Sequence, residues 1–249
     1  MTQAKDTAQL SFFTQPEAVL EYYREHGYHI EHNVFSDEEC AALIAAAGNL
    51  ENAKNGTYRP TMMPHRYDDI YVKAMRNDAI ARVIGELVGG IPAGIQSEFF
   101  YCKPGTRGFS LHQDNFYVEA AQGVFASAWC ALTDTYFEKG GLIVYPGTHV
   151  EGNLPVRKLD LKPDTAQDPN ANNEETIVPP QYQAVNAVVP KGAVLFLHGH
   201  TVHASNPNKT DEWRYVLLNT YIKKGEKFRP GNYAKRAEVD LTEAAEPAN

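Results

Sequence analysis

Eight short segments with the composition of β-strands follow one another from residue 94 onward, and they restrict the possible folds more than any other feature. β-Branched and aromatic residues fill them, and Gly or Pro separates several of them, at residues 104–105, 140–141 and 146–147. In chain order they are IQSEFFYCK, FSLHQDNFYV, VFASAWCALT, LIVYPG, ETIVPP, QAVNAVV, AVLFLH and RYVLLNTYI. This pattern favours a mainly β fold with flanking α-helices. We expect a double-stranded β-helix, the jelly roll of cupin-like proteins, over about residues 94–224.

Helical patterns occupy the chain before this region. Ser36 and Glu39 form a capping box at the start of SDEECAALIAAAG, and PEAVLEYYREHG predicts an earlier helix. Apolar residues recur at positions 80, 83, 84, 87 and 88, and Gly89 ends that pattern. We expect one domain over residues 1–249, with a helical part at about 1–90 and a disordered tail at about 238–249. The polar segment 158–175 is interpreted as either an insertion loop or a lid.

The composition limits the classes of partner. The 249 residues carry a formal net charge of −8, which argues against nucleic acid because contacts with phosphate need a basic surface. The three cysteines are far apart and have no C-x-x-C spacing, so we expect buried, reduced thiols. The N-terminus has no signal-peptide pattern, and no apolar stretch reaches membrane-spanning length. We therefore expect a cytoplasmic protein with a small-molecule substrate and neither nucleic acid nor a membrane as partner. The sequence leaves the oligomeric state open.

A His-x-Asp pair in FSLHQDNFYV carries the clearest chemical signal. Side chains on a strand alternate between its two faces, so His112 and Asp114 would point the same way while Gln113 points to the other side. A second imidazole follows at His203, after the apolar run AVLFLH. Two histidines and one carboxylate on one face of a metal are the ligand set of non-haem Fe(II) oxygenases, and they leave three coordination positions open.

An arginine at the start of the last strand segment suggests the cosubstrate. Arg214 follows His203 in the sequence and opens RYVLLNTYI. Its guanidinium presents a planar fork of donors that suits a carboxylate. Together with the triad, this arginine favours an iron enzyme that uses 2-oxoglutarate.

Three segments resemble the phytanoyl-CoA dioxygenase (PhyH-like) family of Fe(II)/2-oxoglutarate-dependent oxygenases. They are LHQD, ALTDTYFEKGGLIVYPGTH and LFLHGHTVHASNPNKTDEWR, within a similarity that extends from about Phe35 to Ile222. The resemblance implies the cofactor Fe(II) and the cosubstrates 2-oxoglutarate and O2. It also implies that His112, Asp114 and His203 are the catalytic iron ligands.

The same resemblance implies residues that bind the cosubstrate. Arg214, helped by Ser205, would bind the distal carboxylate of 2-oxoglutarate. Gln96 falls where some family members place a glutamine near the other carboxylate. A further set of residues is interpreted as lining the substrate pocket, although core filling explains the aromatic ones equally well: His65, Arg66, Phe116, Tyr117 and Trp129.

Other histidines compete with His203 for the place of the second imidazole. His198 ends an apolar strand, and the family has a histidine there that is not a ligand. His200 is interpreted as a polar group near the mouth of the site, and His149 as a support for its hairpin. His203 is preferred because of its spacing to the serine and arginine that follow.

The expected reaction is hydroxylation of an unactivated C–H bond of a small-molecule metabolite, with release of succinate and CO2. Because Asp114 supplies a carboxylate, no coordination position remains for a halide once 2-oxoglutarate and O2 are bound. Desaturation, epimerisation or another oxidation remains an alternative outcome on the same fold and cofactors. A non-catalytic cupin-like protein that binds a metal or ligand is the alternative from a different class.

Overall fold

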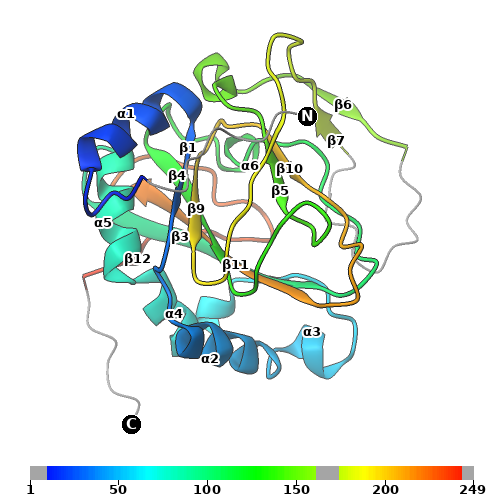
Figure 1. Cartoon of the computed structure of the whole chain (residues 1–249). Helices are drawn as coiled ribbons and strands as arrows, with labels where there is room; N and C mark the ends of the chain where they lie inside the picture. Colours follow the sequence, from blue (N-terminus) through cyan, green and yellow to red (C-terminus); the bar gives the residue numbers. More distant parts are fainter. Residues whose placement is uncertain (1–9, 161–173, 243–249) are drawn as a thin grey trace.

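Two antiparallel β-sheets form the centre of the computed structural model, which describes residues 10–160 and 174–242 (Figure 1). The helices are α1 (Pro16–His26), α2 (Asp37–Ala47), α3 (Glu51–Lys54), α4 (Asp69–Met75), α5 (Asp78–Leu87) and α6 (Asn115–Val118), with the 3-10 turns η1 (Pro64–Arg66) and η2 (Thr148–Glu151). The strands are β1 (Tyr28–Glu31), β2 (Thr61–Met62), β3 (Pro92–Cys102), β4 (Phe125–Ala131), β5 (Leu142–Val144), β6 (Val156–Lys158), β7 (Glu174–Thr176), β8 (Val185–Asn186), β9 (Val194–His198), β10 (His203–Ser205), β11 (Arg214–Lys223) and β12 (Val239–Asp240).

The strand order matches the predicted jelly roll. The larger sheet has seven strands, in the order β1-β9-β4-β11-β3-β12, and β2 also pairs with β3. The smaller sheet has the order β10-β5-β8, and β6 pairs with β7 in a separate ribbon. The ladders within both sheets are antiparallel. Non-consecutive strands lie side by side, so residues far apart in the sequence reach one interior.

The two faces of the larger sheet pack against different partners. Phe100 and Trp129 belong to a core that also contains Leu142 from the smaller sheet, so this face looks into the barrel. Phe99 precedes Phe100 on β3 and therefore points to the opposite face. Together with Leu217 on β11, it belongs to the core that the sheet shares with the helices. Figure 1 shows α1, α2, α4 and α5 on that outer side. The period of two along β3 and β11 therefore decides which side chains can reach a site inside the barrel.

Local sequence signals account for the helix boundaries that were predicted. The Ser36 hydroxyl accepts a hydrogen bond from the backbone N–H of Glu39, and the Glu39 carboxylate accepts one from the N–H of Ser36, which confirms the capping box of α2. Helix α1 ends at Gly27, whose φ of 76° lies in the left-handed region. A Cβ at Gly27 would also lie 2.4 Å from the Thr201 hydroxyl, so only glycine fits there.

Several expectations about the secondary structure were wrong. The region expected to be helical also contains β1, which pairs with β9, and β2, which pairs with β3. The tail expected to be disordered begins with β12, which pairs with β3 next to Gly94. The segment FSLHQDNFYV is not a strand, because His112 forms only an isolated bridge and α6 follows. The central part of the loop or lid, residues 161–173, and the end of the tail, residues 243–249, lie outside the described residues.

Two expectations from composition can be compared with the described residues. Cys40, Cys102 and Cys130 are free and buried, as predicted. No helix within residues 10–160 and 174–242 combines the length and apolar character needed to cross a membrane.

Candidate metal and cosubstrate site

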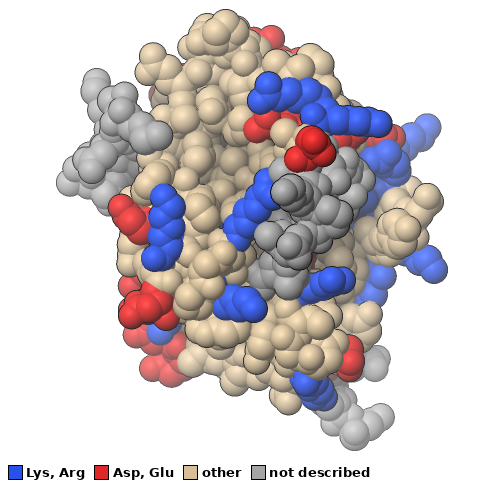
Figure 2. All heavy atoms as spheres, turned by 90° about the vertical axis from the view of Figure 1, so that its right-hand side faces the viewer, with Lys and Arg blue, Asp and Glu red and all other residues tan. Residues whose placement is uncertain are grey.

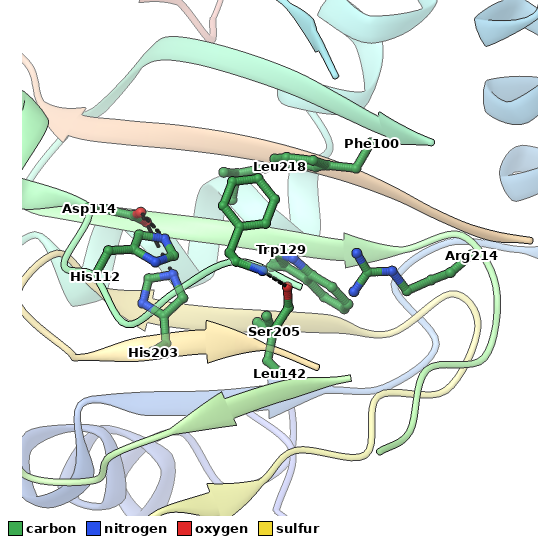
Figure 3. A pocket seen from close by; sticks show the side chains of 10 residues that line it. Phe100, His112, Asp114, Trp129, Leu142, His203, Ser205, Arg214 and Leu218 are labelled. Atoms are coloured by element: carbon green, nitrogen blue, oxygen red, sulfur yellow. Dashed lines mark hydrogen bonds and ion pairs between the residues drawn. The ribbon is translucent and has the colours of Figure 1, made fainter. Parts of the chain in front are cut away.

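The three predicted ligands converge inside the barrel. One oxygen of the Asp114 carboxylate lies 3.7 Å from Nε2 of His112 and 3.8 Å from Nε2 of His203. The ligand atoms of the three residues all lie within 4.8 Å of one another, and among the described residues they form the one such group of three or more. Figure 3 shows the two imidazoles and the carboxylate turned toward one point. This donor set, with two imidazole nitrogens and one carboxylate oxygen, suits Fe(II).

The backbone brings the ligands together differently from the prediction. His112 and His203 face each other in an antiparallel bridge, in which each backbone N–H donates to the other carbonyl at 2.9 and 3.0 Å. Asp114 does not continue a strand, because its φ of −58° and ψ of −36° are helical and it starts α6. The inference from strand alternation was therefore wrong, although the convergence it predicted is present. A turn, rather than a pleat, brings the carboxylate back toward the imidazoles.

Both imidazoles are oriented by backbone carbonyl groups. Nδ1 of His112 lies 2.8 Å from the Ser110 carbonyl oxygen, and Nδ1 of His203 lies 3.0 Å from that of Thr201. A carbonyl can only accept, so in each ring Nδ1 carries a proton, and the neutral form of the ring keeps a lone pair on Nε2 for a metal. Burial lowers the pKa of His112 to about 4, with the neighbouring His203 as the second cause and Asp114 opposing both. The ring is therefore neutral near pH 7.

A buried hydroxyl orients the third ligand. The Ser127 hydroxyl on β4 donates a hydrogen bond of 2.5 Å to Oδ2 of Asp114. This bond leaves Oδ1 as the atom that faces the two imidazoles. Ser127 is fully buried and lies on a central strand of the larger sheet, so it is a rigid support for the carboxylate.

The residues on both sides of Asp114 are held by one neighbouring segment. The side-chain amide of Gln113 donates to the His200 carbonyl at 2.6 Å, and the Asn115 amide lies 2.8 Å from Nε2 of His200. The backbone N–H of Asn115 also donates to the Gly199 carbonyl. His200 therefore supports the turn that carries Asp114, and its ring nitrogen faces Asn115 rather than the triad. His198 is likewise directed elsewhere, toward His149, whose ring centre lies 5.0 Å away.

The predicted arginine lies in the same pocket as the triad. Arg214 is 4% exposed, and its guanidinium stands over the Trp129 ring at 5.7 Å from the ring centre. One Nη donates to the Gly140 carbonyl and the other contacts Sγ of Cys102 at 2.6 Å, whereas the buried Nε has no partner among the described residues. A buried cation with an unused donor is suited to a ligand carboxylate.

Ser205 lies between the arginine and the triad. Its oxygen accepts a hydrogen bond of 2.8 Å from the backbone N–H of Phe109, so the hydroxyl proton remains available for an anionic ligand. The pocket is otherwise mostly apolar, and its lining residues are Phe100, Phe109, His112, Asp114, Trp129, Leu142, His203, Ser205, Arg214 and Leu218. Figure 3 shows the triad at one end, Arg214 at the other, and Trp129 and Ser205 between them.

Two other predicted residues, Gln96 and His65, are not among the residues that line this pocket. Gln96 is buried on β3, where its side-chain oxygen accepts a hydrogen bond from Arg236 at 2.6 Å. The His65 imidazole lies 2.6 Å from the Ser97 hydroxyl, and burial lowers the pKa of His65 to about 4. The roles assigned to Gln96 and His65 stay predictions.

The other proposed substrate contacts fall into three places. Arg66 donates to the Lys235 carbonyl on an exposed surface. Phe116 and Tyr117 belong to α6 and line a separate small cavity, which shares His112 with the pocket that contains the arginine. Trp129, in contrast, lies beside Arg214. Of the five predicted substrate contacts, it is the one that lines the pocket containing the triad.

Two functional candidates were missed by the sequence analysis. Ser127, which orients Asp114, has no local motif that marks it. Glu98 lies two residues after Gln96 on the inner face of β3, and its position could have been found from the period of two. Burial raises the pKa of Glu98 to about 8, with the charge of Asp114 as the second cause and Arg236 opposing. Glu98 therefore interacts electrostatically with Asp114, one of the three predicted metal ligands.

Sequence comparisons identify the family of this chain. The model of the phytanoyl-CoA dioxygenase (PhyH) family matches residues 23–216. Ectoine dioxygenase of Stutzerimonas stutzeri is 23% identical over 231 residues, which cover 82% of this chain and 75% of that protein. Phytanoyl-CoA dioxygenase of Arabidopsis thaliana is 26% identical over 180 residues, 70% of this chain and 60% of its own length.

Solved structures confirm the fold. The α-ketoglutarate-dependent epimerase SnoN from nogalamycin biosynthesis, in complex with Fe3+, α-ketoglutarate and nogalamycin RO, superposes with a TM-score of 0.72 at 20% identity, covering 95% of this chain and 92% of its own. The carbocyclase SnoK from the same biosynthesis gives a TM-score of 0.70 at 21% identity, covering 94% and 91%. The family match spans most of the described chain and contains the triad and Arg214. The chain therefore belongs to the phytanoyl-CoA dioxygenase family of iron- and 2-oxoglutarate-dependent oxygenases.

Proposed function

We propose that this protein hydroxylates an unactivated C–H bond of a small-molecule metabolite, with His112, Asp114 and His203 as ligands of Fe(II) and Arg214 as the anchor of 2-oxoglutarate. The observation that carries the proposal is the shared pocket, which contains both the two-histidine, one-carboxylate group and a buried arginine. A protein that only stored a metal would have no need for a buried cation at the other end of the same cavity.

The ligand assignment is supported by the groups around the triad. Each imidazole has its Nδ1 occupied by a backbone carbonyl and its Nε2 directed at Asp114. The third ligand has one oxygen occupied by Ser127 and the other free. All three residues therefore present one unused donor atom each to one point, which is what a facial triad requires. When bound there, Fe(II) supplies the activation of O2 and the oxidising chemistry.

The cosubstrate assignment rests on Arg214, Ser205 and Trp129. A dicarboxylate that reaches from the triad toward Arg214 would meet the unused Nε–H and the free proton of the Ser205 hydroxyl. Apolar and aromatic side chains form most of the wall between them, so water is displaced when the ligand binds. In this low-dielectric setting the charged hydrogen bonds to Arg214 are strong and direct the other end of the ligand to the metal.

Hydroxylation is favoured as the outcome because Asp114 keeps the triad complete. Iron held by His112, Asp114 and His203 would have the carboxylate ligand that a halide would otherwise replace, so it would supply oxygenation rather than halogenation. The net charge of −8 favours a small-molecule substrate over nucleic acid. Figure 2 shows Lys and Arg side chains in several groups on one face.

The test is turnover of the purified Fe(II) enzyme with 18O2 and a panel of small metabolites, with succinate and product analysed by mass spectrometry. We expect succinate release that depends on one of these metabolites, with one labelled oxygen in succinate and one in the product. An unlabelled product with fewer hydrogens would indicate desaturation, and an isomeric product would indicate epimerisation. No succinate under any condition, with metal bound, would replace the proposal by a cupin-like binding protein.

A further inference from the structure

Glu98 lies on the inner face of the barrel at the level of the metal ligands. Phe100 and Cys102, two and four residues further along β3, belong to the inner core, so the alternation of the strand puts Glu98 on the same face. The register pairs Glu98 with Leu218, which lines the pocket. Cys102, the residue that contacts Arg214, lies four residues further along β3 than Glu98, a span of roughly 13 Å. Glu98 therefore lies well away from the arginine end.

The strand register also relates Glu98 to the third metal ligand. Ser127, which donates to Asp114, pairs with Thr220 on β11, and Thr220 pairs with Gln96 on β3. The row that contains Glu98 lies two positions further along these strands, so it is the next row on the same face as the row that supports Asp114. The electrostatic interaction of the Glu98 carboxyl with Asp114 agrees with this proximity.

No described protein group satisfies the Glu98 carboxyl. Within residues 10–160 and 174–242, nothing donates a hydrogen bond to it or forms an ion pair with it. Arg236 is the cation that acts on it electrostatically. The hydrogen bonds of that guanidinium go elsewhere, from Nε to the Gln96 side chain at 2.6 Å and from one Nη to the Tyr117 carbonyl at 3.1 Å.

The fold gains nothing from an acid at this position. Glu98 is only partly exposed, and placing a carboxyl there without a partner costs stability. Phe100 and Leu218 beside it would pack equally well against an apolar side chain. A group that the protein leaves unsatisfied next to its reactive centre is a candidate for ligand recognition.

We propose that Glu98 determines substrate specificity by binding an N–H or O–H donor of the substrate, an ammonium or a hydroxyl group close to the carbon that is oxidised. The inference rests on the proposed function, because it places the substrate on the side of the metal away from Arg214. In this proposal Glu98 binds the substrate and contacts neither the metal nor 2-oxoglutarate.

The first experiment measures whether Glu98 has a structural role. Glu98→Leu and Glu98→Gln are compared with Glu21→Leu, which changes an exposed acid on α1, in thermal unfolding of the metal-free protein. We expect both Glu98 variants to be at least as stable as the wild type, since an unsatisfied acid has been removed. A clear loss of stability in both would show that Glu98 supports the fold, and would overturn the proposal.

The second experiment measures recognition with three probes of one size: cyclohexylamine, cyclohexanol and fluorocyclohexane. Each is titrated anaerobically into the complex with Fe(II) and 2-oxoglutarate, and binding is followed by the visible absorption of that complex. We expect the wild type to bind one of the two donor probes at least tenfold more tightly than fluorocyclohexane, and Glu98→Leu to lose this preference. Glu98→Gln identifies the donor, because an amide keeps a preference for the alcohol and loses one for the ammonium group.

The affinity for 2-oxoglutarate separates the two proposals. It should stay within about twofold of the wild type in both Glu98 variants, because Arg214 is unchanged. If the wild-type protein forms no absorbing complex with Fe(II) and 2-oxoglutarate, the proposed function has failed before any probe is added. If the complex forms and the wild type shows no preference for a donor probe, or Glu98→Leu keeps it, Glu98 does not have this role.

Discussion

The hydrogen bond from Ser127 to Asp114 offers the sharpest test of how the metal site is held. Among the described residues, Ser127 gives the Asp114 carboxylate its one hydrogen bond from outside the triad, at 2.5 Å and fully buried. A hydrogen bond to a charged group contributes about 1.5–3 kcal/mol. Since each 1.4 kcal/mol corresponds to about tenfold in affinity, Ser127→Ala should weaken Fe(II) binding by about 10- to 100-fold.

The assay for this prediction is an anaerobic competition titration of Fe(II) against a chelator. Thr135→Val is the matched control, because it removes a buried hydroxyl that donates to the Val189 carbonyl at 2.9 Å, outside the site. Thr135→Val should lower stability and leave the metal affinity unchanged, whereas Ser127→Thr should keep most of that affinity. If Ser127→Ala binds Fe(II) as tightly as the wild type while remaining folded, the carboxylate does not depend on this support and the reasoning is refuted.

Two further predictions concern the cosubstrate and the stability of the apoprotein. Arg214→Ala should raise the Kd for 2-oxoglutarate by about 30-fold or more, since loss of a buried charged partner costs about 2–5 kcal/mol, and Arg214→Lys should recover only part of it, which a binding titration would check. An unchanged Kd in Arg214→Ala would place the arginine outside the site. Burial lowers the pKa of His198 to about 3, with His149 and His200 as further causes. Its imidazole therefore stays neutral in the folded protein near neutral pH. In the unfolded chain the same imidazole takes up a proton below about pH 6.5. The free energy of unfolding should therefore fall as the pH is lowered from about 6.5, by about 2 kcal/mol at pH 5 from His198 alone. In urea unfolding, His198→Gln should remove that part of the pH dependence of the unfolding free energy. An identical pH dependence in the variant would contradict the assignment.

Sequence reasoning identified the site residues that have a characteristic ligand chemistry and a characteristic order along the chain. His112, Asp114 and His203 are ligand-type residues in a region of strands, and Arg214 opens the strand that follows. Their convergence was predicted correctly, but for a partly wrong reason. The helical backbone at Asp114 could not be recognised, because residues 109–118 contain enough β-branched and aromatic side chains to resemble a strand. Local composition was overridden by the hydrogen bonds of Gln113 and Asn115 to a distant segment.

The parts that were missed depend on cross-strand register, which a single sequence does not contain. Ser127 lies beside Asp114 because β4 pairs with β9, and the segment after β9 holds the turn that carries Asp114. Glu98 reaches the same interior through the pairing of β3 with β11. Strand β1 was missed because its four residues follow directly after a helix and are too short to show a period. Arg236, which donates to Gln96, comes from the C-terminal segment 140 residues further along the chain, and no local motif relates the two residues.

The most direct test of the central claim is the metal content of three proteins: the wild type, His203→Ala and His200→Ala. Each is reconstituted anaerobically with Fe(II), desalted and analysed for iron, with circular dichroism as the measure of folding. The geometry predicts one Fe(II) per chain in the wild type, none in His203→Ala, and close to one in His200→Ala, whose ring nitrogen faces Asn115 instead of the triad. Full iron in a folded His203→Ala protein, or loss of iron from His200→Ala alone, would contradict the assignment of His112, Asp114 and His203 as the metal site.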